Sequence, residues 1–350
     1  MTTIKKISCK TLVRPLRTAF TTARGTKNNA TSIIVTAICS DGSVGIGEVP
    51  TSFVVPHETP DVIIRHIRGA AKWLAGEPID QWAALTTRLE SVIPNYHMTC
   101  SGVEMALFRA YLASTGSDEQ AWWGRRKPKT IKTDITIPFT DDIESLAPWI
   151  QRAIDKGFDT CKIKVSGSVR SDAKFVAAVA AMLDAAGRPC TLRLDGNQGF
   201  TCESALRLLD RLKVDVELFE QPLRHDDYDG MKKLTAKAPV PIIADETVFS
   251  VEDCRRVIEN GLAHGINIKI AKSGISQSRE IIRLAKKAKL KLMIGCMTET
   301  FVGLSTAIYC AAGSGAFDYI DLDSVHFLFA HNRHRDIATD GAVYHLGAHP

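Results

Sequence analysis

The chain has 350 residues, of which 45% are hydrophobic, a composition typical of a globular protein with a large core. The formal net charge of +5 is modest, and the basic residues are spread along amphipathic segments, which argues against nucleic-acid binding. No apolar run is long enough to predict a membrane span, and the first residues lack the apolar stretch of a secretory signal, so we expect a cytoplasmic protein.

The first third of the chain has the pattern of an α+β domain. Residues 4–48 are rich in strand-forming residues and contain Asp41-Gly42, a dipeptide typical of a β-hairpin turn. The next stretches carry apolar residues three and four apart, the spacing of amphipathic helices, over 60–74, 81–93 and 102–113. We predict that residues 1–128 form a separate α+β domain.

From Thr133 onward, strand and helix patterns alternate strictly. Strands are predicted over 133–137, 160–165, 190–195, 216–221, 241–246, 265–270, 291–297 and 319–324. Helices are predicted between them, for example over 172–186, 202–212, 251–260 and 277–288. Eight strands in this alternation indicate an α/β fold, a TIM-like (β/α) barrel, over residues 129–325. Residues 326–350 carry little pattern, and we leave open that they return to the first domain.

Acidic residues recur at the ends of three consecutive predicted strands, namely Asp195, Glu220 and Asp245. Each residue alone would more often be a helix N-cap or an ion-pair partner. In a parallel barrel, however, the C-terminal ends of all strands open onto one mouth, so these carboxylates converge there. Like charges that close require a cation or a proton between them. An all-oxygen ligand set favours Mg²⁺, with Mn²⁺ as a possible substitute.

Lysines occupy strand ends at the same predicted mouth. Lys162 and Lys164 alternate on the second strand and so face the same side. An exposed edge strand would also accept two lysines, but a closed barrel has no edge. Loss of the α-proton from a carboxylate bound to the metal would give a planar enediolate. Lys164 and Lys269, on the second and sixth strands, are expected on opposite sides of the mouth, one at each face of this intermediate, as two-base epimerisation requires. A lysine base needs a depressed pKa, which nearby positive charge from Mg²⁺, Lys162 or Lys272 could supply.

With these motifs the sequence resembles the enolase superfamily, in its muconate-lactonising subgroup, over essentially the whole chain. The motifs that carry the resemblance are Lys162-Ile163-Lys164, Asp195-Gly196-Asn197-Gln198, Glu220-Gln221-Pro222, Ala244-Asp245-Glu246 and Asn267-Ile268-Lys269. The resemblance implies that Asp195, Glu220 and Asp245 are metal ligands and that Lys164 and Lys269 are the acid and base. It also implies a cap made of residues 1–128 together with the C-terminal tail.

Within the subgroup, Cys296-Met297-Thr298-Glu299 and Asp321-Leu322-Asp323 look like the corresponding segments of dipeptide epimerases. Two alternate carboxylates can hold the α-ammonium of a dipeptide, although an Asp pair can also cap a loop. Arg24 matches an arginine that contacts the glutamate side chain in epimerases of Ala-Glu, although a lone loop arginine is usually only solvated. The residues expected to bind substrate are therefore Arg24, Thr136, Lys162, Cys296, Thr298, Asp321 and Asp323.

Three functions remain open at this point. The first is a Mg²⁺-dependent dipeptide epimerase, with L-Ala-D/L-Glu as the favoured substrate. The second is a muconate cycloisomerase or an o-succinylbenzoate synthase-like lyase, and the third is a barrel that only binds ligand. The Asp321 and Asp323 pair argues against the second, because those substrates lack an α-ammonium. The chain departs from its relatives at Lys272-Ser273-Gly274-Ile275, where they generally carry two glycines, so a shorter loop is expected after Lys269. A homo-oligomer is possible.

Overall fold

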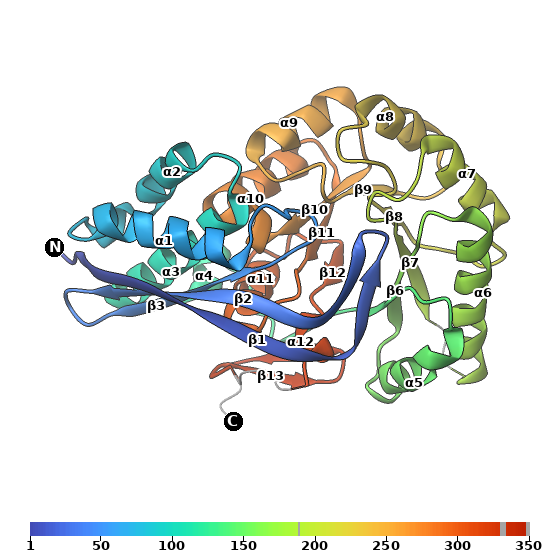
Figure 1. Cartoon of the computed structure of the whole chain (residues 1–350), viewed down its shortest axis with the longest axis horizontal. Helices are drawn as coiled ribbons and strands as arrows, with labels where there is room; N and C mark the ends of the chain where they lie inside the picture. Colours follow the sequence, from blue (N-terminus) through green and yellow to red (C-terminus); the bar gives the residue numbers. More distant parts are fainter. Residues whose placement is uncertain (188–189, 330–333, 348–350) are drawn as a thin grey trace.

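The structure is a computed structural model that describes residues 1–187, 190–329 and 334–347. Its N-terminal part is a three-stranded antiparallel sheet in the order β1 (Ile4–Thr22), β2 (Gly25–Cys39) and β3 (Val44–Pro50), as the strand pattern predicted. Helices and short turns follow as α1 (Pro60–Leu74), η1 (Ile79–Gln81), α2 (Trp82–Val92), α3 (His97–Thr115) and α4 (Glu119–Trp123). Figure 1 shows this sheet and its helices beside the barrel.

Helix α1 illustrates why these segments fold as predicted. The Thr59 hydroxyl accepts a hydrogen bond from the Val62 amide at the N-terminus, and Pro60 occupies the first turn, where its missing N–H costs nothing. Its buried residues recur at helical spacing and form one apolar stripe: Ile63, Ile67, Ala70 and Leu74. The stripe packs the helix onto the sheet formed by β1 and β2.

The β1–β2 hairpin extends beyond its own domain and reaches the barrel (Figure 1). The pairing register shifts between Pro15 and Phe20, which leaves extra residues on β1, and such a bulge bends a hairpin. Its turn is tight, because Thr22 pairs directly with Gly25. At the tip, the side chain of Ala23 lies close to Gly199, a residue of the loop after a barrel strand, since a Cβ on Gly199 would come within 3.2 Å of it.

Eight parallel strands form the second part, which confirms the predicted α/β barrel. In sequence order they are β5 (Ile135–Ile137), β6 (Thr160–Lys164), β7 (Thr191–Asp195), β8 (Phe219–Glu220), β9 (Ile242–Ala244), β10 (Gly265–Lys269), β11 (Lys291–Gly295) and β12 (Tyr319–Asp321). Each strand lies within its predicted range. The first and last strands meet at a seam, where the Asp134 amide donates to the Ile320 carbonyl at 3.3 Å and the Leu322 amide donates to the Thr133 hydroxyl at 2.7 Å.

Helices cover the outside of this barrel (Figure 1). They are η2 (Ile143–Leu146), α5 (Ala147–Asp155), α6 (Val169–Ala185), α7 (Cys202–Arg211), α8 (Tyr228–Lys237), α9 (Val251–Asn260), α10 (Ile270–Lys287) and α11 (Phe301–Ser314). The short helix α12 (Ser324–Phe327) lies instead beside the hairpin, where Phe327 packs against Phe20 of β1. Helix α10 begins directly after Lys269, whereas the sequence pattern placed its start near residue 277. Gly274 interrupts it with φ 67° and ψ −170°, a conformation suited to glycine. None of the helices in the described ranges is long and apolar enough to cross a membrane.

Buried glutamates join the two parts. Glu104 of α3 accepts hydrogen bonds from the amides of Ile275 (2.6 Å) and Ser276 (3.0 Å), just after the interruption in α10. Glu48 of β3 accepts from the amides of Thr300 and Gly303 at the N-terminus of α11. Helix N-termini carry unpaired amides and a positive dipole, so each carboxylate fixes a barrel helix to the cap.

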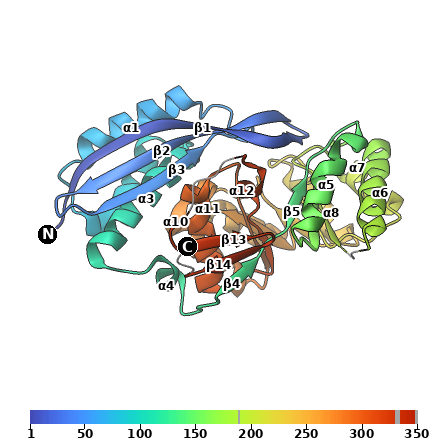
Figure 2. The same cartoon turned by 90° about the horizontal axis from the view of Figure 1, so that it is seen from below.

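The C-terminal part contacts both domains. Strands β13 (Ile337–Asp340) and β14 (Val343–Leu346) pair with β4 (Thr130–Lys132) in a small antiparallel sheet, visible from below in Figure 2. Nearer the cap, the Phe329 amide donates to the Pro15 carbonyl of β1 at 3.2 Å. The segment predicted to lack pattern therefore contains two strands. The domain limits at 128 and 325 stay predictions, and part of the predicted tail, 330–333 and 348–350, lies outside the described residues.

Candidate active site

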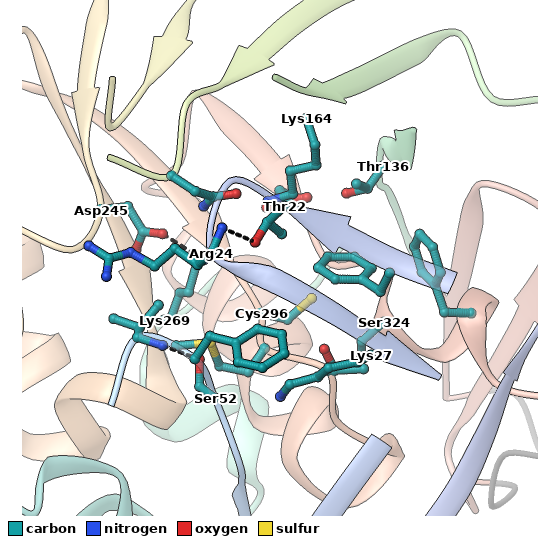
Figure 3. A pocket seen from close by; sticks show the side chains of 18 of the residues that line it. Thr22, Arg24, Lys27, Ser52, Thr136, Lys164, Asp245, Lys269, Cys296 and Ser324 are labelled. Atoms are coloured by element: carbon teal, nitrogen blue, oxygen red, sulfur yellow. Dashed lines mark hydrogen bonds and ion pairs between the residues drawn. The ribbon is translucent and has the colours of Figure 1, made fainter. Parts of the chain in front are cut away.

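A pocket lies at the C-terminal ends of the barrel strands, under the β1–β2 hairpin, the usual place of the active site in such barrels. Figure 3 shows that side chains from both the hairpin and the barrel surround it. Ten of the residues expected from the sequence line this pocket: Arg24, Thr136, Lys162, Lys164, Asp245, Lys269, Cys296, Thr298, Asp321 and Asp323. The other two, Asp195 and Glu220, lie below it and are fully buried.

The register of strands β6, β7 and β8 places charged residues side by side. Lys164 on β6 pairs in register with Asp195 on β7, which in turn pairs with Glu220 on β8. The Lys164 Nζ lies 2.5 Å from Asp195 Oδ2, and Lys162 Nζ lies 3.1 Å from Glu220 Oε2 and 3.7 Å from Asp195 Oδ2. Two lysines and two carboxylates thus form one buried network.

Asp245 follows β9 and lies between two other lysines. Its carboxylate is 2.7 Å from Lys269 Nζ and 2.5 Å from Lys272 Nζ, and Lys272 also donates to the Asp245 backbone carbonyl. Lys272 is only 1% exposed. The sequence suggested Lys272 only as a source of positive charge, whereas the structure shows a residue that holds Asp245 in place. The sequence pattern could not indicate this contact, because it placed the start of the helix near residue 277, after Lys272.

Lys164 and Lys269 lie on opposite sides of the mouth. Their strands, β6 and β10, are four positions apart in the eight-stranded order, which is half of the ring. The carboxylates described above come from the strands and the loop between them. The chemistry that this arrangement permits is proton transfer at both faces of a group held between the two amines.

The pKa values differ from the expectation for a lysine base. Although burial alone would lower it, the charges of Asp245 and Glu220 raise the pKa of Lys269 above its usual value. For Lys162 as well, Asp321 and Glu220 outweigh burial and raise the pKa well above normal. The carboxylate charges outweigh that of Lys162, so the neighbouring lysines alone do not depress the pKa of Lys269. The depression expected with Mg²⁺ bound stays a prediction. Lys269 is an ammonium and is suited to donate a proton.

The buried acids of the site differ in how well their charge is stabilised. Burial, reinforced by repulsion from Asp195, raises the pKa of Glu220 to about 7. Burial and the charge of Asp245 likewise raise the pKa of the neighbouring Glu246 to about 7. Conversely, Lys269 and Lys272 overcome the effect of burial and lower the pKa of Asp245. A further cation would stabilise the ionised forms of Glu220 and Glu246.

Unpaired oxygens beside the same acids also fit a cation. Within the described ranges, three buried acceptors without a hydrogen-bond donor are Asn197 Oδ1, Glu246 Oε2 and Asn267 Oδ1. Asn197 adopts a positive φ of 40°, a strained conformation of the kind that clusters at functional sites. Unsatisfied buried acceptors are costly, and carboxylate and amide oxygens are the ligands that Mg²⁺ prefers. The set formed by Asp195, Glu220 and Asp245 therefore fits a divalent cation.

A second acidic group lies on the other side of the barrel interior. Oxygens of Asp134, Asp321 and Asp323 come within 4.8 Å of one another, closer than those of the predicted ligands. Two of these residues form ion pairs, because Arg193 lies 2.7 Å from Asp134 and Lys162 contacts Asp321. Lysines also contact the Asp195 set, so ion pairs do not decide between the two groups. Within the described ranges, three unpaired buried oxygens lie beside the Asp195 set, on Asn197, Glu246 and Asn267, whereas the second group has one, on Asp134, and for that reason the Asp195 set is the better candidate.

Asp323 stands at the pocket wall beside the first barrel strand. It accepts a hydrogen bond from the Thr136 amide at 2.6 Å, and its other oxygen is 3.8 Å from Cys296 Sγ. Burial, together with the charge of Asp321, raises the pKa of Asp323. Two adjacent carboxylates facing a pocket are arranged to accept hydrogen bonds from an ammonium group. The sequence pattern had anticipated this pair.

The hairpin supplies the cover of the pocket. Arg24 at its turn is exposed, and its backbone amide donates to the Thr22 hydroxyl at 3.1 Å (Figure 3). Phe20 lies over Lys164, with the Nζ 5.5 Å from the ring centroid. Lys27, which no sequence motif singled out, also lines the pocket. Residues of a distant domain cannot be assigned to a barrel site from strand spacing alone.

Comparisons with known proteins agree with this geometry. A family model described as "Enolase C-terminal domain-like" matches residues 145–349. The chain belongs to the enolase superfamily. It is similar to an L-Ala-D/L-amino acid epimerase of Populus trichocarpa, with 33% identity over 97% of this chain and 82% of that protein. Because such relatives are racemases and epimerases, this enolase-superfamily chain is an isomerase.

Solved structures of this superfamily have the same fold. The substrate-liganded L-Ala-D/L-Glu epimerase of Bacillus subtilis has a TM-score of 0.92 and 29% identity, with 99% of this chain and 97% of that chain covered. The dipeptide epimerase of Enterococcus faecalis V583, complexed with Mg and the dipeptide L-Leu-L-Tyr, has a TM-score of 0.90 and 26% identity over 99% and 97% of the two chains. Similar folds thus act on different dipeptides.

Proposed function

We propose that this isomerase is a Mg²⁺-dependent dipeptide epimerase that inverts the α-carbon of the C-terminal residue by two-base proton transfer. The observation that carries the proposal is the position of Lys164 and Lys269 on strands half a barrel apart, both at the wall of one pocket. A cycloisomerase or a lyase would not need an acid and a base on opposite faces of one carbon. A barrel that only binds ligand would not need these buried charges, which are costly to keep.

In this proposal Asp195, Glu220 and Asp245 hold the metal ion. When bound, Mg²⁺ would neutralise the substrate carboxylate and draw the charge of Asp245 and Glu220 away from Lys269. Lys162 contacts both the metal side and Asp321, so it positions the carboxylates on the two sides of the pocket. Mn²⁺ is a possible substitute, since it accepts the same oxygen ligands.

Asp321 and Asp323 would hold the α-ammonium of the dipeptide. Both are buried at the pocket wall, and a charge-assisted hydrogen bond is strongest where water is excluded. With the ammonium at one side and the carboxylate at the other, the α-carbon of the second residue would lie between the two lysines. Thr136, Cys296 and Thr298, from neighbouring parts of the wall, would contact the dipeptide backbone.

As the substrate pair we propose L-Ala-L-Glu and L-Ala-D-Glu. Arg24 on the hairpin supports this choice, because its guanidinium can pair with an acidic side chain. Relatives named L-Ala-D/L-Glu epimerase occur in Clostridium acetobutylicum and Bacillus subtilis, at 30% identity each. The Enterococcus faecalis V583 complex contains a Leu-Tyr dipeptide instead, so Arg24 rather than the fold supports an acidic substrate.

Each lysine would serve as base for one stereoisomer and as acid for the other. Lys164 would remove the proton from the R isomer and Lys269 from the S isomer, and the opposite lysine would return a proton on the other face. Lys269 is an ammonium without ligand, which suits its role as acid in the R to S direction.

The test is stereospecific exchange in single-lysine variants. Lys164→Ala and Lys269→Ala should each lower the rate of epimerisation by about 10²-fold to 10⁴-fold, the usual contribution of a positioned acid or base. In heavy water each variant should still exchange the α-proton of one isomer only, and the two variants should choose opposite isomers. Proton NMR of both dipeptide isomers measures this exchange.

Two controls accompany this test. Lys213→Ala, in the segment after α7 and far from the pocket lining, should exchange both isomers like the unaltered protein. If either single variant exchanges both isomers, one base reaches both faces and the two-base mechanism is wrong. If a panel of dipeptides takes up no deuterium with the unaltered protein, the function itself is wrong.

A further inference from the structure

Lys27 differs from every other lysine of the pocket in its surroundings. It lies on β2, opposite Phe20 of β1, and its side chain is half-buried. Its Nζ donates to the Thr51 carbonyl and lies 5.1 Å from the centre of the Phe53 ring. These contacts hold the amine at the pocket wall, between the hairpin and the segment that follows β3.

No carboxylate balances this amine. Lys162, Lys164 and Lys269 each form an ion pair with an acidic side chain, whereas Lys27 forms none with any residue in the described ranges. Consistent with this, burial lowers the pKa of Lys27 to about 8. A cation taken out of water without a counter-ion is costly unless a ligand supplies the charge.

We propose that Lys27 is a specificity-determining residue that binds a carboxylate on a side chain of the substrate. The inference rests on the proposed dipeptide epimerase function and names the class of dipeptide that the site takes, one with an acidic residue. Lys27 donates at most one of its three N–H groups to Thr51, so two remain for the substrate. Arg24 at the exposed turn is a second cation on the same hairpin, but only Lys27 is enclosed by neighbouring side chains.

Matched dipeptide pairs can test this role without turnover. In a Lys269→Ala background, calorimetry with Mg²⁺ present gives the Kd of L-Ala-L-Glu and L-Ala-L-Gln, and of L-Glu-L-Ala and L-Gln-L-Ala. The acid and the amide of each pair have nearly the same shape and differ in charge. We expect the acidic member of at least one pair to bind ten times more tightly or better, and Lys27→Met to remove most of that preference.

Control variants separate recognition from a structural role. Lys27→Arg keeps a cation and should retain much of the preference, whereas Lys10→Met, an exposed lysine on β1, should leave it unchanged. If Lys27 only supports the Thr51 to Phe53 segment, Lys27→Met will weaken both members of a pair equally and the ratio will not change, which overturns the inference. The absence of an acidic preference in the parent protein overturns it as well. Preferential binding of acidic dipeptides that the unaltered protein does not epimerise would instead contradict the proposed function and leave the role of Lys27 standing.

Discussion

Charged side chains are paired at the mouth of the barrel but unpaired on the hairpin that covers it, among the described residues. In the barrel, the lysines and carboxylates are almost fully buried, and each lysine faces an acid within hydrogen-bonding distance, as Lys164 faces Asp195. On the hairpin, Arg24 and Lys27 face no acid among the described residues. Buried pairs fix geometry, whereas unpaired cations leave binding capacity for a ligand. The difference suggests that the barrel performs the reaction and the hairpin selects what enters.

The largest effects should follow from removing the barrel acids. Asp195→Asn, Glu220→Gln or Asp245→Asn should each lower kcat/KM by about 10³-fold or more, because a metal ion supplies several kcal/mol of charge stabilisation and about 1.4 kcal/mol is tenfold. Steady-state kinetics measures activity, and calorimetric titration with Mg²⁺ measures the loss of metal binding independently of turnover.

Asp210→Asn, an exposed acid at the end of α7, is the matched control and should bind Mg²⁺ normally. Full turnover after exhaustive chelation would contradict the metal site and would leave the buried acids of the barrel as partners of the lysines only.

An intermediate effect should follow from changing Asp323, at the wall of the pocket. Removing one partner of a buried charge pair costs about 2–5 kcal/mol, so Asp323→Asn should lower kcat/KM for free dipeptides by tenfold or more. The amide can still accept the hydrogen bond from Thr136, which limits damage to the wall. N-acetylated dipeptides should be poor substrates of the unaltered protein. If they react as well as free dipeptides, Asp323 does not bind an ammonium.

The same contrast decides how much of the site the sequence can predict. Strand ends repeat at regular intervals and parallel strands point the same way, so this periodicity is enough to bring Lys164, Asp195, Glu220, Asp245 and Lys269 to one mouth. Asn267 lies two residues before Lys269 on the same predicted strand and therefore faces the same side. This spacing could have predicted it as a residue of the site.

Other features had no sequence signal. Lys27 lies beyond a register shift in the β1–β2 hairpin, and periodicity predicts neither such a shift nor the contact of the hairpin with the barrel. The raised pKa of Lys269 could not be predicted, because it depends on distances to Asp245 and Glu220 rather than on strand positions. The strands of the C-terminal part were missed because β13 and β14 are short and pair with the equally short β4.

The smallest effect on activity should come from changing Glu104, which joins helix α3 of the N-terminal part to helix α10 of the barrel. This carboxylate binds the amides of α10 and lies outside the pocket lining, so Glu104→Gln should change kcat/KM by less than about threefold, because changes at sites without shared partners act nearly independently. Burial, the largest influence, raises the pKa of Glu104 from 4.5 to about 7 despite its hydrogen bonds. The variant should therefore reveal itself in stability rather than in turnover.

The sign of the stability effect follows from proton binding. Between pH 4.5 and about 7 the folded protein keeps a proton on Glu104 that the unfolded chain has lost, so the free energy of unfolding falls as the pH rises through this window. The loss is at most about 3.5 kcal/mol, from roughly 1.4 kcal/mol per pKa unit. Glutamine cannot ionise, so the stability of Glu104→Gln relative to the parent should increase over the same window and stay constant above it.

Denaturant unfolding at several pH values measures this difference in the free energy of unfolding between the variant and the parent, in which the contributions of the other titrating groups cancel. Glu144→Gln, an exposed change on η2, should give a flat difference. A flat difference for Glu104→Gln as well would mean that the carboxylate is ionised in the folded protein and that the amides of α10 compensate fully for its burial.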